Sequence, residues 1–219
     1  MLALLLGLFV ALSSGQSQPL PTSVLLIPLD AKDDEATQDF KAAFPLTTRE
    51  TGVLFDLNGD GRLEQVAWTT PDKATAFLAI DRNGNGMIDN GGELVAHPSA
   101  EAGASAIDTL THMPQSQEDM NESGPAWINH RDPVYEKLLL WTDSNHNGVS
   151  EPSELRKVSD VLTRIGLGCV RFNRSDDYGN RFLFQCWVLM RTAPGPNEPL
   201  DRAESLRRAR RMYEVVLKR

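Results

Sequence analysis

The stretch that decides the fold prediction reads Asp143-Ser144-Asn145-His146-Asn147-Gly148-Val149-Ser150-Glu151-Pro152-Ser153-Glu154. Counted from Asp143, side chains that carry oxygen stand at positions 1, 3, 5, 9 and 12, and glycine stands at position 6. A short loop with this spacing directs several oxygens toward one point, because glycine permits the sharp turn between them. The stretch therefore predicts a loop that holds a hard cation.

The same pattern recurs in two earlier windows, which begin at Asp56 and Asp81. In the first window position 12 is Ala67, so the closing ligand would have to be water or a distant carboxylate. In the second window position 12 is Gly92, and Glu93 one place later indicates a closing acid shifted by an inserted residue. Turn formation alone would explain one Asp-Asn-Gly cluster. Three clusters in one register favour Ca²⁺, which takes six to eight oxygen ligands. Counting the position-7 carbonyls, the predicted ligands are Asp56, Asn58, Asp60, Arg62 and Glu64; Asp81, Asn83, Asn85, Met87, Asp89 and Glu93; and Asp143, Asn145, Asn147, Val149, Glu151 and Glu154.

A further window at residues 121–132 has Pro125 at position 5 and Ala126 at position 6, so we expect it to have lost the metal while still supporting the Asp143 loop. About three calcium ions are therefore expected. Around the loops, the apolar patterns predict short strands at residues 52–55, 65–68 and 76–80, and helices at 104–113, 133–141 and 151–161. The predicted fold class is α+β, with short helices and strands organised around EF-hand-like calcium loops and a C-terminal antiparallel hairpin sheet.

Two cysteines flank the polar stretch 175–180. In a hairpin centred between Asp177 and Tyr178, the numbers of opposed residues sum to 355, which places Cys169 opposite Cys186. We therefore expect a disulfide, with two buried thiols as the alternative. Residues 212–217 are expected to add a strand to this sheet, and a helix is the alternative. The seven Arg and Lys residues within 201–219 are interpreted as a solvated face or an intramolecular partner of the acidic loops.

Residues 1–15 carry no charge and end in Ser13-Ser14-Gly15, which predicts a signal peptide cleaved after Gly15. A membrane anchor is the alternative, although the run is shorter than the ~20 residues that a membrane-spanning helix needs. We therefore expect an exported protein, secreted or periplasmic, with no membrane span after cleavage. Thirty acidic and 22 basic side chains give a net charge of −8, which argues against nucleic-acid binding and favours cations as partners.

Three runs carry a resemblance to a known family: Phe55-Asp56-Leu57-Asn58-Gly59-Asp60-Gly61, residues 78–94, and residues 140–155. They resemble the EF-hand-like calcium modules of secreted bacterial proteins, which occur alone and inside repeats-in-toxin or haemolysin-type exoproteins. The similarity extends over about residues 47–190 and implies calcium ligation by the acidic and amide residues named above. Some toxin modules of this kind cleave themselves at Asp-Pro. Asp132-Pro133 is the sole such pair here, but proline is expected at the start of the predicted helix, so we expect no cleavage.

The predicted function is an exported calcium-binding protein, structural or adhesive, that is not an enzyme, because no HExxH, GxSxG or phosphate-loop motif is present. The alternatives are a dockerin-like partner-binding module and a calcium-dependent hydrolase or self-processing protein. An extracellular protein or polysaccharide is the expected further partner. The predicted segments are a signal peptide at 1–15, an N-terminal strand and linker at 16–46, a calcium-loop domain at 47–163, and a β-hairpin region with a basic tail at 164–219.

Overall fold

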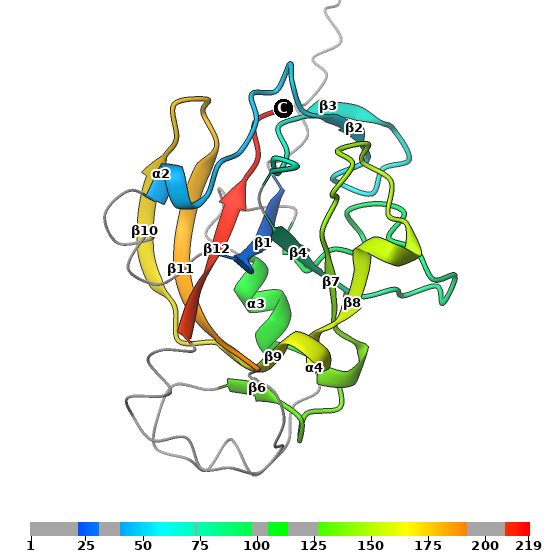
Figure 1. Cartoon of the computed structure of the whole chain (residues 1–219), viewed down its shortest axis with the longest axis vertical. Helices are drawn as coiled ribbons and strands as arrows, with labels where there is room; N and C mark the ends of the chain where they lie inside the picture. The colour runs from blue at the N-terminus through cyan, green and yellow to red at the C-terminus, as the bar shows by residue number, and fades with distance from the viewer. Residues whose placement is uncertain (1–21, 31–39, 73, 98–104, 114–126, 192–208) are drawn as a thin grey trace, which may run out of the picture.

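A ten-stranded sheet organises the protein, and all of its strand pairs are antiparallel. The computed structural model describes residues 22–30, 40–72, 74–97, 105–113, 127–191 and 209–219 (Figure 1). The sheet strands are β1 (Ser23–Pro28), β4 (Thr75–Ala79), β5 (Ala96–His97), β6 (Trp127–Asn129), β7 (Leu139–Trp141), β8 (Leu155–Lys157), β9 (Leu162–Gly166), β10 (Val170–Ser175), β11 (Arg181–Met190) and β12 (Ala209–Val216).

The order along the sheet is β6-β9-β11-β12-β1-β4-β7-β8, with β10 beside β11 and β5 beside β1. A separate two-stranded pair joins β2 (Val53–Phe55) to β3 (Glu64–Val66). The sheet contains strands from each of the three segments expected after the signal peptide, and β9 crosses the boundary expected at residues 163/164. The predicted signal peptide lies outside the described residues.

The α+β prediction is wrong, because the described residues form mostly antiparallel β-structure. Helices are confined there to the short segments α2 (Phe40–Ala43), α3 (Ala106–Thr111) and α4 (Val158–Val161) and the 3₁₀ turns η3 (Tyr135–Lys137) and η4 (Pro152–Glu154). The calcium-loop motifs therefore occur without the flanking helices that the EF-hand-like arrangement would require.

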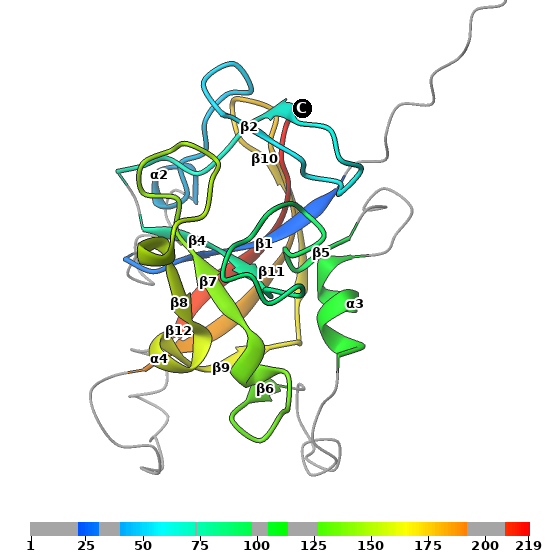
Figure 2. The ribbon, with the colours of Figure 1, turned by 90° about the vertical axis from the view of Figure 1, so that its right-hand side faces the viewer.

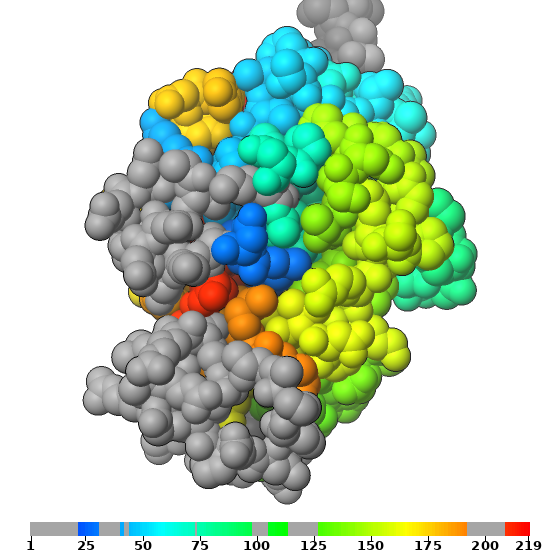
Figure 3. All heavy atoms as spheres, viewed as in Figure 1, coloured from blue at the N-terminus to red at the C-terminus, as the bar shows by residue number. Residues whose placement is uncertain are grey.

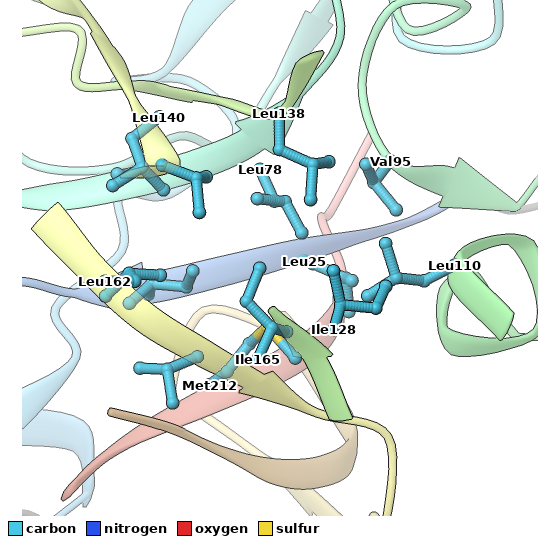
Figure 4. Close-up of a cluster of buried hydrophobic side chains, with 14 of the residues drawn as sticks. Leu25, Leu78, Val95, Leu110, Ile128, Leu138, Leu140, Leu162, Ile165 and Met212 are labelled. Carbon is cyan, nitrogen blue, oxygen red and sulfur yellow. The ribbon is translucent and has the colours of Figure 1, made fainter. Parts of the chain in front are cut away.

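Two hydrophobic clusters lie on opposite faces of the central strands. In β1, Leu25 and Ile27 belong to one cluster, while Val24 and Leu26 belong to the other, as the two-residue period of a strand requires. Figure 4 shows the first cluster, where Leu25, Leu78 and Leu140 from adjacent strands lie with Leu110 of α3 and Ile165 of β9. Burial on both faces explains why the residues of β1 that follow Ser23 are all apolar and why the strand is fully buried.

The helix predicted at residues 133–141 is wrong. This segment contains η3 and then β7, which pairs with β4 on one side and β8 on the other. Leu140 faces the first cluster and Trp141 the second, so both faces of the strand are apolar. A short strand buried on both faces has a continuous apolar sequence, which cannot be distinguished by periodicity from a buried helix.

The exit helix predicted at residues 151–161 is also wrong, since this segment forms η4, β8 and α4 in succession. Leu155 pairs with Trp141, so the chain returns along β7 immediately after the loop. By contrast, the helix predicted at 104–113 is confirmed as α3, which begins with a capping box between Ser105 and Asp108. The three strands predicted near residues 52–55, 65–68 and 76–80 are confirmed as β2, β3 and β4.

The C-terminal hairpin is confirmed together with its disulfide. Val170 pairs with Gln185 and Arg171 with Phe184, both in the predicted register, and Cys169 and Cys186 are bonded with 4.4 Å between their Cα atoms. A register shift between Arg171 and Arg174 then displaces the pairing by one residue toward the turn. The predicted final strand is confirmed as β12, which pairs with β11 and also with β1.

Candidate metal centre

The three predicted metal loops each connect antiparallel chain segments (Figure 1). The Asp56 loop joins β2 to β3, and the Asp143 loop joins β7 to β8. The Asp81 loop follows β4, and its chain returns beside that strand, where the Val95 amide donates to the Leu78 carbonyl at 2.8 Å. Antiparallel backbone pairing, instead of packed helices, therefore holds both ends of every loop.

The turn at the start of each loop is the same. The carboxylate at position 1 accepts a hydrogen bond from the backbone N–H of the position-6 glycine, at 2.8 Å in all three loops: Asp56 from Gly61, Asp81 from Gly86, and Asp143 from Gly148. Those glycines have φ angles of 83°, 82° and 71°, in the region that favours glycine. The sharp turn expected at the position-6 glycine is thus confirmed in all three loops.

In the Asp81 and Asp143 loops the amides at positions 3 and 5 point at the position-9 acid. Asn83 and Asn85 donate to Asp89 at 2.8 and 2.7 Å, and Asn145 and Asn147 donate to Glu151 at 3.2 and 2.8 Å. These side chains therefore converge within each loop. The other carboxylate oxygen of Glu151, Oε2, is buried and has no hydrogen-bond partner among the described atoms.

The closing acid occupies equivalent places in these two loops although its sequence position differs. Glu93, at position 13, accepts hydrogen bonds from the N–H groups of positions 2, 3 and 9, which are Arg82, Asn83 and Asp89, at 3.0, 3.3 and 2.9 Å. Glu154, at position 12, accepts from the same positions, Ser144, Asn145 and Glu151, at 2.8, 3.4 and 3.4 Å. Both glutamates are buried. The inserted residue thus leaves the closing carboxylate in place.

The ionised form of Glu154 is favoured. Burial opposes ionisation, but hydrogen bonding with Glu151, Ser144 and Trp141 outweighs burial and lowers the pKa of Glu154 below its ordinary value. The buried Glu151 Oε2 atom, which has no hydrogen-bond partner among the described atoms, belongs to the same loop, and carboxylate oxygens of this kind suit a cation site.

The position-9 acid of the Asp56 loop has a different partner. Glu64 Oε1 lies 3.3 Å from Nη1 of Arg219, so the basic tail does act as an intramolecular partner of one acidic loop. Burial raises the pKa of Glu64 above its usual range; Arg219 opposes this increase, whereas Asp60 and Asp56 add to it. The Asp56 loop is therefore already paired with a cationic side chain of this protein.

The three loops contact one another and form a continuous surface, visible on the right of Figure 3. The position-8 residues of two loops meet where the Ile88 amide donates to Ser150 Oγ at 2.6 Å. The Gly91 amide donates to the Asp56 carbonyl at 2.8 Å. The 121–132 window, which was expected to support the Asp143 loop, lies partly outside the described residues, at 121–126; residues 127–129 form β6, which pairs with β9.

Sequence reasoning missed the aromatic residues beneath the loops. The rings of Phe55, Trp68, Phe77 and Trp141 pack with centroid separations of 4.4–5.6 Å. Trp68 Nε1 donates to Asp143 Oδ2 at 2.8 Å, and Trp141 Nε1 donates to Glu154 Oε2 at 3.3 Å. Trp141 stands two residues before Asp143, so its place in the sequence already indicated that it lies near this loop, whereas no local pattern links Trp68 to a loop 75 residues away.

His146 was also missed as a contact between loops. Its backbone has a positive φ of 59°, and its Nδ1 and Nε2 atoms lie 2.9 Å from the carbonyl oxygens of Thr69 and Thr51 respectively. The imidazole therefore spans the segments on either side of the β2–β3 pair. This position explains why a histidine without metal-ligand spacing stands in the middle of the Asp143 loop.

Asp132, which precedes the only Asp-Pro bond of the sequence, lies in the turn that follows β6. The β6 strand lies away from the β2–β3 pair in both ribbon views (Figures 1 and 2). Asp132 is buried, and its carboxylate accepts a hydrogen bond from the Asn129 amide at 2.7 Å. This hydrogen bond within the turn explains the aspartate at position 132, because aspartate favours turns by accepting such bonds from the backbone.

Carboxylates alone do not define a metal centre here. Among the described residues, no three His, Cys, Asp or Glu side chains are grouped closely enough to hold an ion by themselves. Each loop instead combines its acids with amide side chains and a position-7 carbonyl, ligand types that Ca²⁺ accepts in addition to carboxylates. Within the described part of the chain, no helix is long and apolar enough to cross a membrane.

The SPM domain profile matches residues 41–189, which span all three loops and the disulfide hairpin. The chain belongs to the SPM domain family. This SPM domain is also similar to the iron-regulated protein FrpA of Neisseria meningitidis serogroup C, with 32% identity over 130 residues. The alignment covers 59% of this chain and 11% of that protein, so the chain matches about a tenth of its relative. Neither name states a ligand, and calcium binding remains a prediction.

Proposed function

We propose that this SPM domain is an exported calcium-binding protein in which each ion is held within one loop and stabilises it. The observation that carries the proposal is the equivalence of Glu93 and Glu154, which reach the same place in two loops despite different spacing. A turn-forming motif alone would not require a buried carboxylate at that place. A loop that surrounds a divalent cation does, because the closing acid supplies two ligand oxygens.

The residues present fit calcium in the Asp81 and Asp143 loops. Position 1 would supply a carboxylate oxygen, positions 3 and 5 amide oxygens, and position 7 a backbone carbonyl. The position-9 acid would complete one side of the site, where Glu151 Oε2 is buried without a partner. The asparagine amides donate through nitrogen to that acid, while their oxygens accept from the backbone N–H groups of positions 5 and 7. Rotation of an amide would turn its oxygen toward the ion at the expense of that backbone contact. When bound, calcium would supply charge that relieves the repulsion between the loop carboxylates.

The energetic role that we infer is stabilisation of the loop surface. Extracellular sites of this class have Kd values of about 10⁻⁴–10⁻³ M. At ten times the Kd, one site adds roughly 1.4 kcal/mol to the free energy of unfolding, so two sites add about 3 kcal/mol. That sum is a substantial part of the ~5–15 kcal/mol that stabilises a typical domain. The free energy of unfolding is therefore expected to be highest in a calcium-rich environment outside the cell.

Export and a structural or adhesive role complete the proposal. The Cys169–Cys186 disulfide supports an oxidising compartment, because such bonds form and persist outside the reducing cytosol. Asp81, Asp143 and Glu154 accept hydrogen bonds from N–H groups of the loops and of Trp68, which favours a structural use of these carboxylates over a catalytic one. The further partner proposed is an extracellular protein or polysaccharide.

Native mass spectrometry and isothermal titration calorimetry of the disulfide-bonded protein would test calcium binding. We expect Glu93→Gln and Glu154→Gln each to remove one ion from the count or weaken its site at least tenfold. Asp132→Asn should leave the count unchanged, since Asp132 belongs to a separate turn. Binding of no calcium at millimolar concentration, or equal effects of all three substitutions, would refute the proposal.

A further inference from the structure

The Asp56 loop lacks the closing acid that its two neighbours have. Its position 12 is Ala67, whose side chain has no oxygen, and the Ala67 amide donates to the Lys218 carbonyl at 2.8 Å. At the corresponding place, the other loops bury Glu93 and Glu154. The end of the Asp56 loop is therefore fixed to the chain that follows β12, and no acid of its own closes it.

The acid at position 9 is also oriented differently in this loop. Asp89 and Glu151 accept hydrogen bonds from the asparagine amides of their own loops. Glu64 is instead paired with Arg219, and Asn58 donates to Asp60 at 3.1 Å. The side chains at positions 3 and 9, which contact each other in the neighbouring loops, thus have different partners in the Asp56 loop.

The guanidinium of Arg219 contacts two other residues. Its Nη2 atom donates to Thr22 Oγ1 at 2.8 Å, while Nη1 faces Glu64. The side chains of Arg219 and Glu64 are only 17% and 26% exposed, so the pair is partly shielded from solvent. The backbone beside it is also fixed, since the Lys218 amide donates to Asn180 Oδ1 at 2.9 Å. A fixed positive charge therefore lies against a loop with three acids.

We propose that Arg219 is the built-in counter-ion of the Asp56 loop and takes the charge-neutralising role that calcium has in the other two loops. The protein then binds two calcium ions, not the three that the repeated motif predicts. The inference rests on the proposed calcium sites at the Asp81 and Asp143 loops. A dication that entered the Asp56 loop would be repelled by the guanidinium charge of Arg219 and would have to break the ion pair between Arg219 and Glu64.

Ion counting by native mass spectrometry with Arg219→Gln tests this inference. We expect two calcium ions on the unmodified protein and a third, weaker one on Arg219→Gln at millimolar calcium. Adding Asp60→Asn to that variant should return the count to two, which would assign the third ion to the Asp56 loop. Arg164→Gln, which removes an exposed arginine of β9, is the matched control and should stay at two.

Two results would overturn the inference. One is a count of three on the unmodified protein, with one ion lost in Asp60→Asn, because the loop would then hold calcium beside Arg219. The other is a count of two on a folded Arg219→Gln protein, which a melting curve would verify. In either case, losses caused by Glu93→Gln and Glu154→Gln would still support calcium binding in general, so the two failures are distinguishable.

Discussion

Glu154→Gln is the substitution for which the structure gives the clearest magnitude. Glu154 Oε1 accepts hydrogen bonds from the amide and hydroxyl of Ser144 at 2.8 and 2.9 Å, and Oε2 accepts longer ones from Trp141 and Glu151. Glutamine retains one acceptor oxygen and should direct it to Ser144, where the contacts are shortest. The amide nitrogen would then face the N–H groups of the Trp141 ring and the Glu151 backbone in a buried place. It cannot accept a hydrogen bond from either of them.

The loss is that of a charged acceptor for the longer pair of contacts. Hydrogen bonds to charged groups contribute about 1.5–3 kcal/mol, and the lengths of 3.3 and 3.4 Å favour a combined loss within that range. For a chain of this size, each kcal/mol changes the melting temperature by about 2–4 °C, so we expect a decrease of roughly 3–12 °C in chelator. In excess calcium the decrease should be larger, because the variant also loses an ion.

Melting followed by circular dichroism and by tryptophan fluorescence, with and without calcium, measures both effects. Trp141 should report the change directly through its contact with Glu154. Glu136→Gln, which changes an exposed acid of η3, is the control and should alter neither quantity. Equal melting temperatures of the Glu154→Gln and unmodified proteins in chelator would refute our account of the hydrogen-bond network. An equal increase of both melting temperatures on addition of calcium would refute the calcium site.

Three further predictions follow from other contacts. Ser150→Ala leaves the buried Ile88 amide without its acceptor and should reduce the free energy of unfolding by about 1–3 kcal/mol in urea titration; a change under ~0.5 kcal/mol would contradict the bridge. Replacing both Cys169 and Cys186 by serine should cost roughly 3 kcal/mol for a loop of this length, also by urea titration, and unchanged stability would show the bond to be dispensable. Burial raises the pKa of Glu214, so stability should fall as pH rises through that pKa; Glu214→Gln should flatten this part of the pH–stability profile, and an unchanged profile would exclude Glu214 as its source.

Local chemistry was readable where a short stretch fixes its own conformation. The position-6 glycines, the short helix expected near residues 104–113 and the opposed cysteines each follow from residues close in sequence, and the structure confirms them. The displaced acid Glu93 also lies where the shifted spacing indicated. In each case the relevant interaction spans fewer than 20 residues, so the sequence pattern contains both partners.

The fold class could not be read in this way because it depends on distant partners. Leu138-Leu139-Leu140-Trp141 is compatible with a helix until β4 and β8 are known to lie on either side of β7. The site has the same limitation, since Trp68 reaches Asp143 from 75 residues away and Arg219 reaches Glu64 from β12's end. No periodicity in one segment specifies what will cover its second face.

The pairing of β1 with β12 has a consequence for the time at which the protein can fold. Ser23 and Glu214, joined by a hydrogen bond, are 191 residues apart, and their strands lie in the middle of the sheet. Until residues 209–216 leave the ribosome, β1 lacks one neighbour and the first cluster lacks Met212. Contacts of such long range slow folding. The emerging chain therefore cannot complete its sheet before β12 has been synthesised, which is compatible with the proposed export through a membrane channel.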